Sequence, residues 1–235
     1  MTAKHERRPQ PVARAFRQAL NLAFCLALLG TGSAAFAQTA ESGVDCPPPE
    51  ASTSAPQDYR RTTPQSRVFV ERRHFTPRVE NLRSGESTKR PGPDIAYTLQ
   101  KFPNHHRALV SMVRLAERHK TDKPPGVERS VACWFDLAVR FAPGDTVVRG
   151  LFASYLHSQG RKSEALKQLE VARQRAADNP ISVYSIGTVY LAIGEFESAL
   201  ELAHQARRLG DPRTALEQAL RSSGHWRDPT PPEPK

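Results

Sequence analysis

Apolar residues recur at a helical spacing over the second half of the chain. They lie three or four positions apart in five successive stretches, which span 94–102, 104–119, 127–141, 146–179 and 180–213. This period places the apolar side chains on one face of an α-helix. Prolines and glycines separate the stretches, and such residues interrupt or close helices. The pattern therefore predicts an all-α fold with short connections between the helices.

The apolar pattern of 146–179 is repeated 34 residues later in 180–213. Seven matching places in the earlier unit hold Phe152, Ala153, Leu156, Gly160, Ala165, Leu169 and Ala172. The same places in the later unit hold Ile186, Gly187, Tyr190, Gly194, Ala199, Ala203 and Ala206. Small residues let two helices approach closely, large residues fill the space beside them, and the glycines suit the end of a helix. The repeat predicts two consecutive helix–turn–helix units.

These residues resemble the tetratricopeptide repeat (TPR) family, whose period is 34 residues. The resemblance implies a helical solenoid over 94–226, with about three repeats at about 106–145, 146–179 and 180–213 and a closing helix at 213–222. The first repeat is degenerate, because TDKPPG at 121–126 interrupts it. The segments HFTP at 74–77, FPNHHRAL at 102–109 and CWFD at 133–136 are similar to exported proteobacterial repeat proteins of unassigned function.

The TPR resemblance also implies where a partner would bind. In this family the inner face of each first helix meets the ligand, a peptide or helix of another protein. The repeat register places on that face Arg107, Val110, Arg114, Ser154, His157, Tyr184, Thr188 and Leu191. The resemblance implies protein–protein interaction, and it implies neither an enzymatic activity nor a cofactor.

The first 37 residues have the layout of a secretory signal peptide. A basic leader precedes an apolar run at 19–29, and Ala35-Phe36-Ala37 forms a small-residue cleavage site. Cleavage after Ala37 predicts a periplasmic protein. The alternative is an uncleaved leader, which would make the chain a membrane-anchored scaffold. The chain after residue 37 keeps 29 basic and 23 acidic residues, a net charge of +6, and export argues against a nucleic-acid partner.

Residues 38–93 predict a proline-rich, irregular N-terminal arm with one short helix, at 76–82. Cys46 of this arm and Cys133 are candidates for a disulfide, because an exported protein meets an oxidising compartment. The alternative is a free, buried Cys133 and an unattached Cys46. We expect Tyr59 to dock the arm onto the helices. The tail at 227–235 is rich in proline and is expected to be disordered.

The sequence contains no motif for catalysis or for a resident metal. His105 and His106 are adjacent, so on a helix their side chains point about 100° apart and do not share one ion. We expect His105 and Asp145 to cap or pack the starts of helices. The sequence favours a periplasmic adaptor or assembly factor for an envelope complex. A second interpretation makes the helices a support for a small ligand-binding element in 38–93. The oligomeric state stays open.

Overall fold

The computed structural model describes residues 46–47 and 55–229, and within them every regular element is a helix. The helices are α1 Pro64–His74, α2 Pro77–Glu80, α3 Gly92–Lys101, α4 His106–His119, α5 Val131–Phe141, α6 Thr146–Ser158, α7 Lys162–Ala176, α8 Pro180–Ala192, α9 Phe196–Arg208 and α10 Ala215–Ser222. All described residues belong to the unit Gln38–Lys235. The predicted signal peptide at 1–37 lies outside the described residues, as does the last part of the tail, 230–235.

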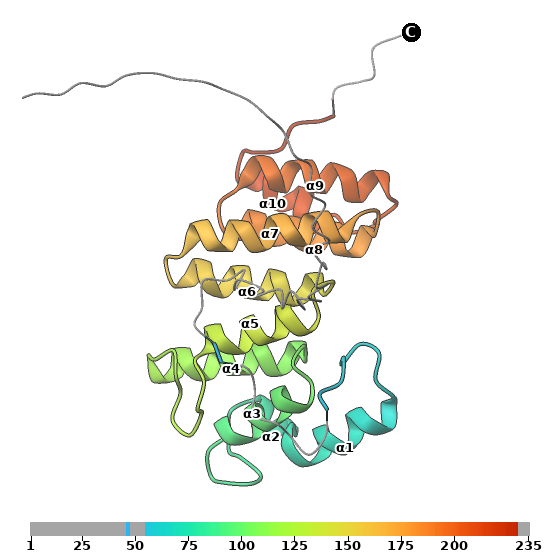
Figure 1. Cartoon of the computed structure of the whole chain (residues 1–235). Coiled ribbons are helices and arrows are strands. Elements are labelled where there is room, and N and C mark those ends of the chain that lie inside the picture. The colour runs from blue at the N-terminus through green and yellow to red at the C-terminus, as the bar shows by residue number, and fades with distance from the viewer. Residues whose placement is uncertain (1–45, 48–54, 230–235) are drawn as a thin grey trace, which may run out of the picture. The chain divides into compact units, whose positions relative to one another are not determined.

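The helices from α4 onward are arranged as paired layers. Helix α6 packs lengthwise on α7, and α8 packs in the same way on α9 (Figure 1). Each first helix also contacts the layer before it, because α6 contacts α4 and α5, and α8 contacts α6 and α7. The closing helix α10 contacts both α8 and α9. The chain therefore adds one helix pair after another, and each pair covers the apolar side of its neighbour.

Three-residue turns join the helices within the two later pairs. Gly160 and Gly194 lie in these turns with φ of +73° and +80°, in the left-handed region that glycine adopts without strain. In contrast, eleven residues, 120–130, separate α4 from α5. This longer loop accounts for the interrupted pattern of the first pair.

The core of the paired layers consists of the repeated small and large residues. The repeat positions that pack between helices are all buried: Phe152, Ala153, Ala165, Leu169, Ala172, Ile186, Gly187, Tyr190, Ala199 and Ala206. Gly187 shows why one of them must be small. A Cβ atom on Gly187 would lie 2.8 Å from Leu216 Cδ2 and 3.2 Å from Leu202 Cβ. Close approach at α8 thus lets α10 close the end of the helical core.

The N-terminal segment is more ordered than the sequence pattern predicts. We expected one short helix within 38–93, but the described residues of this range already form two, α1 and α2. The 11-residue α1 begins at a Thr63 cap whose side chain accepts the Ser66 N–H, with Pro64 in the first turn. Its apolar residues, Val68, Phe69 and Val70, are consecutive, so they form no stripe at helical spacing. For this reason the periodicity did not indicate α1.

The described helices are short. Among residues 46–47 and 55–229, none is both long enough and apolar enough to cross a lipid bilayer.

Candidate functional site

The solvent-facing side of α4, α6 and α8 carries most of the residues expected to bind a partner. Arg114 of α4 and Ser154 of α6 are exposed, and Val110 of α4 is 37% exposed. Thr188 and Leu191 of α8 are half-buried, as is His157 of α6. These helices contact one another in the order α4, α6, α8. The structure therefore brings residues from three successive first helices onto adjoining surfaces.

Two exposed apolar residues on these helices were not among the expected contacts. Val147 is 45% exposed and Ile181 is 65% exposed. Each is the second residue of its helix, and the two are 34 positions apart. The Thr146 hydroxyl donates to Ser182 Oγ at 3.3 Å, so the first turns of α6 and α8 lie side by side. Their position in the repeat is a signal that could have identified them from the sequence.

Tyr184 does not lie on an open surface. It is buried, and its hydroxyl oxygen accepts the Leu216 N–H at 3.2 Å. The guanidinium of Arg213 lies 3.8 Å from the ring centroid. The segment that leads into α10 thus covers this side chain, so the expectation that Tyr184 contacts a partner is corrected. A register taken from the repeat alone cannot show that a closing helix occupies the last inner position.

Two of the three arginines of α4, Arg107 and Arg114, differ in their electrostatic surroundings. Arg107 makes a bidentate ion pair with Glu80 of α2, with Nε–Oε1 and Nη2–Oε2 distances of 2.7 and 2.6 Å. This pair holds the pKa of Glu80 below its usual range. Arg114 is exposed and makes no ion pair with any residue of the described part of the chain. Arg107 is already neutralised, so Arg114 is the arginine of the expected binding face that can meet an acidic partner.

A dense polar cluster attaches the N-terminal arm to the starts of α4 and α6. The Tyr59 N–H donates to Asn104 Oδ1 at 2.9 Å, and its hydroxyl donates to Glu71 Oε1 at 2.8 Å. Asn104 Nδ2 donates to Asp58 Oδ1 at 2.7 Å and to Asp145 Oδ2 at 3.0 Å. The Tyr59 ring also packs on the His105 ring, with centroids 4.1 Å apart. The prediction that Tyr59 docks the arm is confirmed.

His105 and Asp145 have the capping roles that the sequence predicted. His105 Nδ1 accepts the Ala108 N–H at 3.1 Å, and Asp145 Oδ1 accepts the Val148 N–H at 3.2 Å. Since His105 Nδ1 is an acceptor, Nε2 carries the proton that is donated to Glu71 at 3.0 Å. Burial lowers the pKa of His105 to about 4, against the opposing effect of Glu71. The neutral ring is a structural link between the two segments.

One arrangement near α3 contains the residue types of a hydrolase triad. Asp94 is buried, and its carboxylate accepts from His74 Nδ1 at 3.0 Å and from the Ser87 hydroxyl. Ser87 Oγ lies 3.4 Å from the same His74 Nδ1. A triad needs serine and aspartate at opposite nitrogens of the imidazole ring. Here both face Nδ1, so the geometry is that of a carboxylate that fixes the 84–88 loop.

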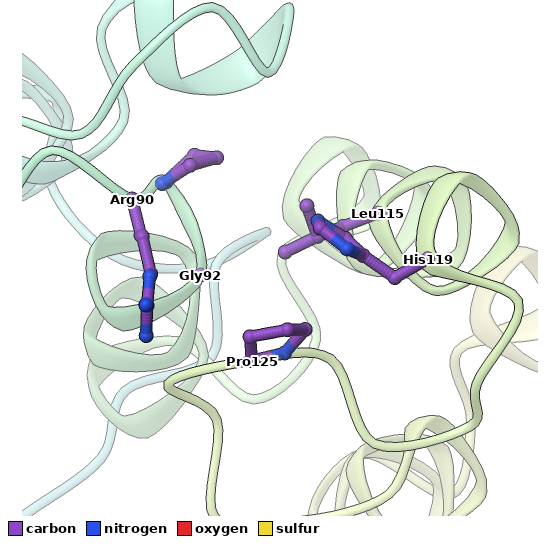
Figure 2. A pocket seen from close by; sticks show the side chains of 6 residues that line it. Arg90, Gly92, Leu115, His119 and Pro125 are labelled. Atoms are coloured by element: carbon purple, nitrogen blue, oxygen red, sulfur yellow. The ribbon is translucent and has the colours of Figure 1, made fainter.

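Two hollows lie beside the N-terminal helices. The smaller, of about 180 Å³, lies between the start of α3, the end of α4 and the following loop, where Arg90 and His119 border it (Figure 2). The larger, of about 510 Å³, lies between α1 and α3, and its walls include Phe69, Tyr97 and Phe102. Neither hollow contains a convergent set of nucleophile and base. Residues 46–47 and 55–229 also contain no group of three metal-ligating side chains.

A disulfide joins the arm to α5. Cys46 and Cys133 are bonded, with their Cα atoms 5.2 Å apart, so of the two alternatives that the sequence left open the structure has the disulfide. Backbone carbonyls of the arm add two contacts: Pro47 O accepts from Arg129 at 2.8 Å, and Cys46 O accepts from Arg140 at 3.2 Å. The arm is therefore held at two separate places, at the disulfide and at the Tyr59 cluster.

Comparison with protein-family models, with curated proteins and with solved structures finds no match. The functional argument therefore rests on the residues and contacts of this chain.

Proposed function

We propose that this chain is a TPR-like repeat module that binds a peptide or helix of a protein partner. The binding surface is the first-helix face, which we define as Arg114, Val147, Ser154, Ile181 and Thr188. The 34-residue period, the paired helices and the closing helix support this fold assignment. Helical repeats of this kind present their first helices to ligands, which dock as extended peptides or as helices.

The observation that carries the proposal is the exposure of Val147 and Ile181. Isolated exposed apolar residues are ordinary, but these two occupy the same place in successive units and lie on adjoining helix starts. Arg114 adds an exposed cation without an ion-pair partner in the described part of the chain. A segment that carries apolar residues and a carboxylate would complement both features.

The leader and the disulfide support a periplasmic location. A signal peptide at 1–37 would deliver the chain to the periplasm, where a bond between Cys46 and Cys133 is stable. In that compartment a binding module without catalytic residues acts as an adaptor or assembly factor for an envelope complex.

The test is cross-linking in intact cells, followed by affinity capture of the chain from the envelope fraction. Arg114→Glu combined with Ile181→Asp alters the first-helix face at exposed positions, so folding should be preserved. The matched control is Arg175→Glu combined with Lys167→Gln on α7, which makes the same total charge change of −3 at exposed sites outside the face. We expect partners that are captured by the wild type and the control and lost in the double variant. Equal capture by all three proteins would refute the assignment of this face.

A further inference from the structure

The outer side of α1 is a helix face that nothing in the described part of the chain covers. Gln65, Val68, Phe69, Arg72 and Arg73 are all exposed. Their spacing of three and four residues places them on one side of the helix. Val70, on the opposite side, is buried. We call these five residues the α1 outer face.

This face combines large apolar side chains with cations. Phe69 is 60% exposed and Val68 is 41% exposed. The Arg73 guanidinium lies 4.3 Å from the Phe69 ring centroid, and Arg72 makes no ion pair within residues 46–47 and 55–229. The hollow between α1 and α3 borders Phe69, so this ring has free space beside it as well.

The charge around the face is strongly positive. Residues 60–90 contain nine Lys or Arg and three Glu, a net charge of +6. The three carboxylates are already engaged, because Glu71 accepts from Tyr59 and His105, Glu80 pairs with Arg107, and Glu86 accepts the Thr76 hydroxyl. None of these carboxylates forms an ion pair with Arg72 or Arg73 in the described part of the chain, so both arginines can pair with an external anion.

We propose that the α1 outer face docks the protein onto an anionic lipid surface. The headgroup region of such a bilayer offers phosphates to Arg72 and Arg73, and the layer beneath it accepts Phe69 and Val68. A nucleic acid would satisfy the arginines but would leave Val68 in water. A second copy of the chain, placed face to face, would bring the arginines against themselves. A lipid surface is the occupant that satisfies both features of the face.

The docking would leave the partner-binding surface free. The α1 outer face belongs to a helix that packs on α3, whereas the first-helix face belongs to α4, α6 and α8. Both surfaces could be occupied together, which would place the captured partner next to a membrane.

The test is co-sedimentation with large vesicles, using the unit Gln38–Lys235 so that the apolar run of the leader makes no contribution. This unit contains all the described helices and the disulfide. We expect binding to vesicles of phosphatidylcholine with a quarter phosphatidylglycerol, and little binding to pure phosphatidylcholine. Arg72→Glu with Arg73→Glu should weaken binding about tenfold or more. Val68→Ser with Phe69→Ser should also weaken it. Lys167→Glu with Arg175→Glu, an equal charge change on α7, should alter it less than about twofold.

A fluorescence measurement separates docking through this face from attraction by net charge. The emission of Phe69→Trp should shift to the blue on anionic vesicles, because the indole enters the interface. The emission of Ile181→Trp, at an exposed apolar position on α8, should not shift. Absence of binding to the anionic vesicles, equal loss of binding in the α7 control, or a shift at Ile181 alone would overturn the proposal.

Discussion

A single histidine shows how the N-terminal arm depends on charge state. His105 is fully buried between the Tyr59 ring and Phe75, and both of its ring nitrogens are used. Nδ1 accepts from the start of α4 and Nε2 donates to Glu71 on α1. A proton on Nδ1 would break the helix cap, while a charged ring in this place would lose its hydration. The folded state therefore favours neutral His105.

This neutral state predicts a stability loss under mild acid. Burial lowers the pKa of His105 from 6.5 to about 4, so between these values the unfolded chain binds the proton more strongly. The free energy of unfolding should thus fall as the pH drops from 6.5 to 4, with about 3 kcal/mol from this residue. Urea denaturation at a series of pH values measures this slope.

The variant His105→Asn isolates the contribution of this residue. Asparagine keeps a side-chain oxygen for the Ala108 N–H but cannot titrate, so the slope between pH 6.5 and 4 should become smaller. His119→Asn, at an exposed position on the same helix, is the control and should behave like the wild type. Carboxylates whose pKa values are lowered, such as Asp145, Asp94 and Glu80, add to the slope at the acidic end of this window, but they do so equally in the wild type and in both variants. An unchanged slope in His105→Asn would contradict the assignment.

At the scale of the helix, the equivalent N-cap residues of the two repeats make different numbers of polar contacts. Asp145 and Asn179 are the caps of α6 and α8, 34 residues apart, and each accepts one backbone N–H. Asp145 is buried, and its carboxylate also accepts hydrogen bonds from Asn104 at 3.0 Å and His106 at 2.9 Å and pairs with Arg60 at 3.2 Å. The cap of α6 is therefore also the anchor of the N-terminal arm.

This difference predicts unequal costs for the same substitution. Asn179→Ala removes a cap and should lower the free energy of unfolding by about 1 kcal/mol. Asp145→Ala removes a cap and leaves three donors without their acceptor, so we expect a loss of about 3 kcal/mol. Chemical denaturation of the two variants measures both values. Equal losses would mean that the arm cluster adds nothing to stability.

The elements that the sequence predicted well are those with a repeated pattern. Helices α6 and α8 begin at Thr146 and Pro180, where the 34-residue period places the start of each unit. Helix α1 had no such pattern, since its apolar residues are consecutive and its stability comes from contacts with α3. The repeat pattern also could not predict that Tyr184 is buried, because its burial depends on α10 packing back against α8. Periodicity reports local burial and does not report which distant segment completes it.

At the scale of the whole molecule, the N-terminal arm is attached to α4, α5 and α6 at separate points. Its anchors are the Cys46–Cys133 bond on α5, the Arg60 ion pair with Asp145 at the start of α6, and the Asp58 and Tyr59 contacts with Asn104 before α4. These anchors are far apart in sequence, so each closes a long loop of chain. Residues 38–93 and the later helices should for this reason unfold together.

The disulfide should be the strongest of these anchors. It closes a loop of 87 residues, and the chain-entropy estimate for such a loop is about 4 kcal/mol, an upper value. Cys46→Ser places a polar side chain at a half-buried site and should lower the free energy of unfolding toward that extent, as urea denaturation would show. Dithiothreitol should destabilise the wild type to the level of the variant and leave the variant unchanged. If the reduced wild type and Cys46→Ser were both as stable as the oxidised protein, the arm would be held by its polar cluster alone, and Asp145→Ala would then be expected to release it.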